Sequence, residues 1–236
     1  MGKALIIPGA DFSVNGIQPE YTRLSWIGAS NENGKHIASG LFFGDKVGNL
    51  DEELEFCVTL DRSKLDDPTS GVCYSMGSGV NNPTNVKVWF QSGTSAYYFS
   101  SNNSTGSNRV VSKVVNGSLW DNQPHTIKIN KHGGSIDNNT FTFDFEPDLT
   151  GISEASYNNS PIYLDCNSKA GAGNDVVASQ TEDVEKIHWV KYRRNGVLIL
   201  DAIPVRRNSD GKIGFYDLVN DEYHFRNNDS VPVYGL

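Results

Sequence analysis

The feature that most constrains this chain is the repetition of apolar side chains at every second position. Segments 54–60, 86–90, 127–129 and 141–145 all alternate apolar with polar residues. A period of two places alternate side chains on one face of a strand, so each segment is expected to be a half-buried β-strand. No window of a dozen residues shows the 3.6-residue period of an amphipathic helix.

Turn signals separate these segments. Asn195-Gly196 lies between the apolar segments 187–192 and 197–200, and Asn-Gly between two such segments is a strong hairpin signal. Asn, Ser, Gly and Asp cluster at 100–108 and 132–139, where they favour turns. Spacing of this kind predicts antiparallel strands in a sandwich rather than strands that alternate with helices.

The predicted fold class is therefore all-β: a two-sheet antiparallel β-sandwich with at most short helical turns, at 61–67 and 179–185. Of 236 residues, 37% are hydrophobic and 11% aromatic, which is enough for one core. We expect one domain over residues 21–236, preceded by a leader or strand at 1–20 that is a candidate assembly contact.

Charge and apolar runs exclude some partners. The formal net charge of −8 argues against nucleic acid and anionic membranes, because both are bound through an excess of Lys and Arg. The N-terminal apolar run is only about four residues long, too short for a signal peptide or a membrane span. We expect no nucleic-acid partner, no membrane insertion and no signal peptide. The widely spaced Cys57, Cys73 and Cys166 are expected to be buried free thiols.

A family resemblance is carried by the last third of the chain, in segments 189–207 (WVKYRRNGVLILDAIPVRR) and 211–220 (GKIGFYDLVN). These segments resemble the ending of concanavalin A-like, laminin G-like jelly-roll domains of gut Bacteroidetes and their phages. Segments 24–28 and 34–40 are similar to the opening strands of that family. The leader segment 4–13 resembles leaders of phage structural proteins.

The resemblance implies a concanavalin A-like jelly roll that ends in a strand at Tyr234-Gly235. It also implies that Gly214 lets Tyr216 pack closely. Asp201 and Arg206 are expected to pair across a turn around Pro204.

Carbohydrate binding is the sharpest functional hypothesis, because sugars stack their C–H faces on aromatic rings beside Asn-rich and Asp-rich loops. The candidate glycan-binding residues are Trp89, Tyr97, Tyr98 and Trp120. The alternative is that these rings lie in the core, at its rim or at a subunit interface.

Carboxylates two residues apart are candidates for glycoside hydrolysis. Glu53 with Glu55 and Asp144 with Glu146 have this spacing, but neither pair continues as the E-x-D-x-x-E motif of sandwich-fold glucanases. Alternate acidic residues on a strand are usually its solvated face. No G-x-S-x-G motif is present either, so we expect no catalytic residues and a chain that is not an enzyme.

No cofactor is expected, although calcium remains an alternative, because clustered loop oxygens can bind it. The calcium candidates fall in two groups, Asn81, Asn82 and Asn85 in one and Asp165, Asn167 and Asn174 in the other.

Three functions remain open. The first is a non-enzymatic structural or host-recognition module of a phage virion, in the head or as a tail-fibre or decoration protein. Such a homo-oligomer would be made in the host cytoplasm and would contact other virion or surface proteins and surface glycans. The second is a lectin-like glycan-binding module of a bacterial cell-surface protein. The third is a glycoside hydrolase on the same fold.

Overall fold

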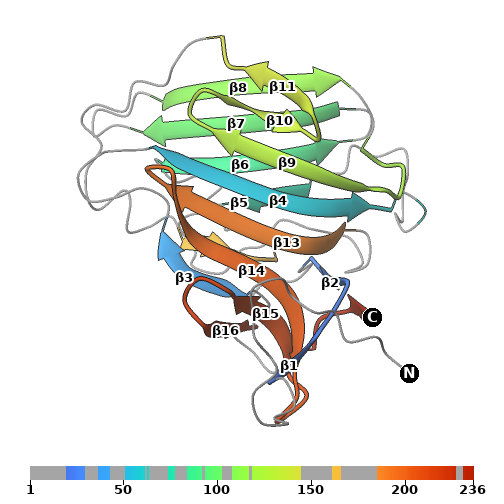
Figure 1. Cartoon of the computed structure of the whole chain (residues 1–236). Coiled ribbons are helices and arrows are strands. Elements are labelled where there is room, and N and C mark those ends of the chain that lie inside the picture. The colour runs from blue at the N-terminus through green and yellow to red at the C-terminus, as the bar shows by residue number, and fades with distance from the viewer. Residues whose placement is uncertain are drawn as a thin grey trace.

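The protein is a β-sandwich of two antiparallel layers, with the large sheet in front and the second layer behind it (Figure 1). The predicted all-β sandwich is confirmed. Among the described residues, no helix is long and apolar enough to cross a membrane. The computed structural model describes residues 20–29, 37–42, 51–61, 63, 74–77, 84–91, 94–102, 108–116, 119–144, 161–165, 185–226 and 231–236. Of these, only the backbone is described for residues 42, 74–77, 84–91, 94–102, 108–116, 161 and 163.

Eleven strands form the large sheet, whose main path runs β11-β10-β9-β4-β13-β14-β15-β16. β1 pairs with β14, and β2 joins β13 to the C-terminal β17. The strands are β1 (Tyr21–Arg23), β2 (Trp26–Gly28), β4 (Glu52–Leu60), β9 (Pro124–Asn130), β10 (Gly133–Ile136), β11 (Asn139–Thr142), β13 (Glu185–Arg194), β14 (Val197–Arg207), β15 (Ile213–Asp217), β16 (Glu222–Phe225) and β17 (Tyr234–Gly235).

The second layer contains a four-stranded sheet in the order β5-β6-β7-β8 and the pair β12-β3. An isolated bridge between Ile37 and Arg226 links the residue before β3 to the residue after β16. The strands are β3 (Ala38–Phe42), β5 (Tyr74–Gly77), β6 (Thr84–Gln91), β7 (Thr94–Asn102), β8 (Asn108–Asn116) and β12 (Pro161–Tyr163).

The alternation in β4 shows how the core is built. Leu54, Phe56 and Val58 are at most 1% exposed and point toward the second layer. Phe56 is registered with Ile127 of β9 and with Val190 of β13, which are also fully buried. Since successive side chains of a strand point to opposite faces, the polar residues between them lie on the outer face of the large sheet.

The hairpin between β13 and β14 forms where the Asn-Gly signal predicts it. Asn195 and Gly196 have φ values of 51° and 74°, the left-handed backbone that a tight hairpin turn requires. The turn is further held by the Asn195 N–H, which donates to the carbonyl of Asp51 at 2.7 Å. The strand predicted at 141–145 corresponds to β11, which begins at Asn139 and ends at Thr142.

The predicted turn at Pro204 is wrong, because β14 runs straight through it. The carbonyl of Pro204 accepts from Leu24 N–H, and Asp201 pairs with Lys191 rather than with Arg206. β17 confirms the predicted terminal strand at Tyr234-Gly235.

Gly214 has a different role from the predicted one. A Cβ there would lie 2.1 Å from the carbonyl oxygen of His224 and 2.8 Å from Cδ1 of Phe225. The glycine therefore allows close approach of β16, not of Tyr216.

A buried polar cluster lies where β13 begins. The carboxylate of Asp165 accepts from Nε of Arg226 at 3.2 Å and from Ile37 N–H at 2.7 Å, and both charged side chains are at most 1% exposed. Glu185 lies nearby, and its Oε1 has no hydrogen-bond partner. Burial, together with the charge of Asp165, raises the pKa of Glu185 to about 8, so this side chain is mostly neutral at pH 7.

Candidate functional site

Three of the predicted glycan-binding residues lie on the paired strands β6 and β7 of the second layer, and the fourth lies in the segment before β9. Trp89 belongs to β6 and is registered with Ala96, whereas Tyr97 and Tyr98 belong to β7; the side chains of all three lie outside the described part. Trp120 is 8% exposed and packs in the hydrophobic core. For Trp120 the alternative, that the ring lies in the core, therefore holds.

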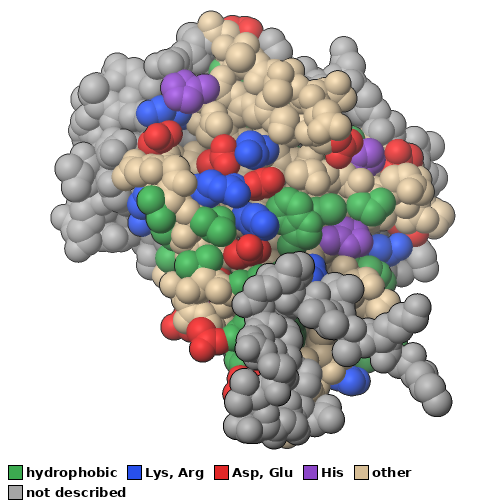
Figure 2. Space-filling view, viewed as in Figure 1, with side chains coloured by type: hydrophobic (Ala, Val, Ile, Leu, Met, Phe, Trp, Pro, Cys, Tyr) green, Lys and Arg blue, Asp and Glu red, His purple; other side chains and the backbone are tan. Residues whose placement is uncertain are grey.

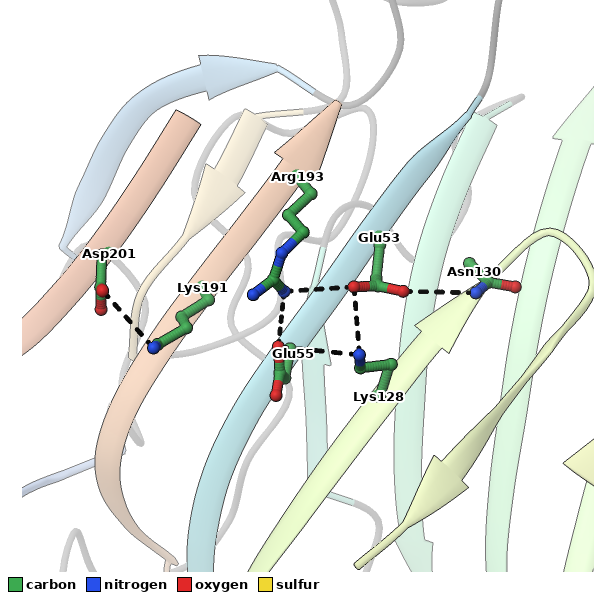
Figure 3. Close-up of polar contacts among 7 residues, drawn as sticks. All are labelled: Glu53, Glu55, Lys128, Asn130, Lys191, Arg193 and Asp201. Atoms are coloured by element: carbon green, nitrogen blue, oxygen red, sulfur yellow. Dashed lines mark hydrogen bonds and ion pairs between the residues drawn. The ribbon is translucent and has the colours of Figure 1, made fainter. Parts of the chain in front are cut away.

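A network of charged side chains occupies the outer face of the large sheet, where acidic and basic groups gather beside hydrophobic ones (Figure 2). We call this network the polar ladder. It comes from four neighbouring strands, β9, β4, β13 and β14. Its members are Glu53, Glu55, Lys128, Asn130, Lys191, Arg193 and Asp201 (Figure 3).

Glu53 and Glu55 form the centre of the ladder and point toward the same guanidinium (Figure 3). Nη1 of Arg193 lies 3.1 Å from Oε1 of Glu53 and 2.5 Å from Oε2 of Glu55. Lys128 approaches the same two oxygens at 3.4 and 4.0 Å, and Asn130 donates to the other oxygen of Glu53 at 3.4 Å. Because both oxygens approach one nitrogen, they lie less than about 6 Å apart, a limit that includes the roughly 5 Å separation of a retaining glycosidase pair.

The other end of the ladder adjoins an aromatic ring. Nζ of Lys191 lies 3.4 Å from Oδ2 of Asp201 and 5.3 Å from the ring centroid of Trp189. Trp189 itself is partly exposed. Hydrogen-bonding groups therefore lie beside an accessible aromatic face, the combination that sugar binding uses.

Trp189 lies on this face by the same alternation that places Lys191 and Arg193 there, and a β-bulge just before it adds His188. Ile187 is registered with Val58 and Trp189 with Cys57, so His188 is an extra residue in β13. Both Ile187 and Val190 are fully buried, whereas His188 and Trp189 are partly exposed. The bulge thus places two consecutive side chains outside the core, which a regular strand cannot do.

His188 is held as a neutral imidazole. Its Nδ1 lies 2.8 Å from the carbonyl oxygen of Ser25, which can only accept, so Nδ1 carries the proton. Nε2 then accepts from the hydroxyl of Thr59 at 2.9 Å. Burial, with a smaller effect of the Lys186 charge, lowers the pKa of His188. The ring therefore ties the bulge to two neighbouring strand segments.

Cys57 lies beside Trp189 on β4 and is 8% exposed, as predicted for a buried free thiol. Burial raises its pKa to about 11, so the thiol is protonated at neutral pH and is not a nucleophile there. Cys73 and Cys166 lie outside the described residues.

Four of the six calcium candidates lie outside the described residues. Of the other two, Asp165 forms an ion pair with Arg226 and Asn85 lies in β6. Calcium binding therefore stays an untested alternative. Within the described ranges, no group of three or more His, Cys, Asp or Glu side chains is arranged to hold a metal ion.

Sequence reasoning missed His188, Trp189, Lys191 and Arg193, although it singled out Glu53 and Glu55. One signal was available: the inward positions 187, 190 and 192 are spaced by three and then two, which marks an inserted residue. Glu146, the partner proposed for Asp144, lies outside the described residues.

Comparison with known proteins gives one kind of match. A scan against family models finds no matching family, and a search of curated proteins finds no match. Among solved structures, the chain is similar to a family 16 glycoside hydrolase from the mixed-linkage glucan utilisation locus of Bacteroides ovatus, in complex with a G4G4G3G product. The match has a TM-score of 0.34 and 14% identity, and covers 61% of this chain and 69% of that one.

The prediction that this chain is not an enzyme is corrected by that comparison, because the matching structure is a glycoside hydrolase. A likeness of this size does not transfer the activity of that enzyme to this chain. Glycoside hydrolysis stays open as the third function expected from the sequence.

Proposed function

We propose that the chain binds a glycan on the outer face of the large sheet, at Trp189 and the polar ladder. The observation that carries the proposal is the partly exposed ring of Trp189 on the outer face, beside the Lys191–Asp201 ion pair. The β-bulge at His188 adjoins this ring, and bulges are frequent next to active sites. The ring supplies an apolar platform, and the ladder supplies donors and acceptors for sugar hydroxyls.

Calorimetric titration of soluble polysaccharides tests the proposal with Trp189→Ala. Removing an aromatic stacking contact worth about 1.4 kcal/mol weakens binding about tenfold. Tyr234→Ala is the matched control: Tyr234 is 38% exposed, but it is registered with the buried Ile27 and so faces away from the site. Thermal denaturation is used to show that both proteins are folded. Equal affinity of wild type and Trp189→Ala would then refute the proposed site.

Glycoside hydrolysis is the second candidate, favoured by the proximity of the Glu53 and Glu55 carboxylates around Arg193. A retaining mechanism needs one carboxylate as nucleophile and one protonated carboxyl as acid. A bound sugar would therefore have to displace Arg193 from one of them. Release of reducing sugar by wild type, lost in both Glu53→Gln and Glu55→Gln, would support hydrolysis; activity retained in both variants would remove this pair from consideration.

The virion role and the homo-oligomer remain predictions from the sequence, as does the alternative location on a bacterial cell surface. Glycan binding is compatible with each of them, since host recognition and surface lectins both use it. Static light scattering of the full chain tests the oligomer, and a monomeric mass would contradict it.

A further inference from the structure

The polar ladder satisfies its charges internally. Three basic groups face three acidic ones: Lys128 and Arg193 contact Glu53 and Glu55, and Lys191 contacts Asp201. The net charge of the ladder is therefore zero. Its charged side chains are also only partly exposed, between 17% and 36%, so water screens these pairs less than it would on an open surface.

A charged sugar would meet an unfavourable site. To pair with Arg193, a uronate or sulfate group would have to approach within a few ångströms of Glu53 and Glu55, which already share that guanidinium. The approach would place a third negative charge beside the two carboxylates. Displacing either carboxylate would separate it from Arg193, its nearest basic partner. Lys191 offers no better position, because Asp201 lies 3.4 Å from its ammonium group.

An uncharged sugar meets no such conflict. Lys191 has three N–H donors and the ion pair with Asp201 occupies one direction, so further donors are available to hydroxyl groups. Carboxylate oxygens likewise accept more than one hydrogen bond each. Lys191 lies over the Trp189 ring, and a pyranose would stack its C–H face on the part of the ring that stays exposed, without any charge requirement.

We infer that the ligand of this face is an uncharged polysaccharide. This inference rests on the proposed glycan-binding function and specifies its substrate class. The charge balance of the ladder rejects acidic chains, while its unused hydrogen-bonding capacity and the adjacent indole accept neutral ones.

Affinity electrophoresis and calorimetry of the full chain provide the test, with a neutral β-glucan, a galactomannan, polygalacturonate and chondroitin sulfate as probes at low and high salt. Binding of a neutral probe, with affinity unchanged by salt and at least about tenfold above that for either acidic probe, supports the inference. Salt-sensitive binding of an acidic probe overturns it and leaves glycan binding standing. Binding of no probe overturns the proposed function and the inference together.

A charge-shift variant tests the physical reason directly. Glu55→Gln leaves Arg193 and Lys128 with one carboxylate between them, so this variant is expected to gain salt-sensitive affinity for polygalacturonate. Glu222→Gln, at the exposed first residue of β16, makes the same change in net charge away from the ladder and is the control. No gain in Glu55→Gln, or an equal gain in Glu222→Gln, would show that ladder pairing does not exclude acidic chains and would overturn the inference.

Discussion

Replacing the buried Glu185 with glutamine should remove a large part of the pH dependence of stability. The structure raises the pKa of Glu185 from its ordinary value of 4.5 to about 8, through burial first and the Asp165 charge second. Between these values the folded state holds a proton that the unfolded state releases. Stability therefore falls as pH rises through this window, by on the order of 5 kcal/mol at about 1.4 kcal/mol per unit.

The measurement is urea unfolding of wild type and Glu185→Gln at intervals from pH 4.5 to 8.5. The pKa of His125 is raised and the pKa values of His188 and His224 are lowered, but both proteins carry these histidines, so the difference between the two curves isolates Glu185. The variant should gain relative stability steadily with pH. Parallel curves would refute the reasoning and show that Glu185 ionises normally inside the fold.

Three further predictions concern the fold. Gly214→Ala should lower the free energy of unfolding by about 1–3 kcal/mol and Tm by several degrees, because the added methyl group meets the carbonyl oxygen of His224. An unchanged Tm would contradict this contact. Burial lowers the pKa of His125, but the hydrogen bonds and charges of Asp137 and Asp121 outweigh it, so the pKa is raised overall. The stabilising effect of His125 is therefore present below pH 6.5 and lost as pH rises through the folded pKa. The stability difference from His125→Gln should shrink toward pH 8 and not grow. Glu52→Gln should lower the free energy of unfolding, measured by chemical denaturation, by about 2–3 kcal/mol. This loss is smaller than for a fully buried ion pair because Arg194 is partly exposed. A loss near zero would show that the ion pair does not stabilise the fold.

The sequence predicted the parts of the fold that depend on local pattern. Period-two alternation identified β4 and β9, and Asn195-Gly196 identified the β13–β14 hairpin, because strand faces and tight turns depend on neighbouring residues. The turn expected around Pro204 from the family resemblance is absent. Pro204 lies within β14, where its carbonyl oxygen accepts a hydrogen bond from the Leu24 N–H.

The site was harder to predict because it depends on register between distant segments. The Glu53–Glu55 spacing was visible along the chain, but pairing with Arg193 and Lys128 follows from alignment of β4 with β13 and β9. Trp120 shows the opposite problem: it was a candidate for sugar binding because aromatic rings beside Asn-rich loops suit that role, whereas tertiary packing buries the ring.

The four tryptophan indole N–H signals in a nitrogen–proton correlation spectrum test the central claim most directly. During titration with a neutral hexasaccharide, the account predicts that the signal of Trp189 moves most while that of the buried Trp120 stays in place. Assignment comes from single Trp→Phe variants. Movement of Trp89 with a stationary Trp189 would contradict the account and place the glycan on the four-stranded sheet instead.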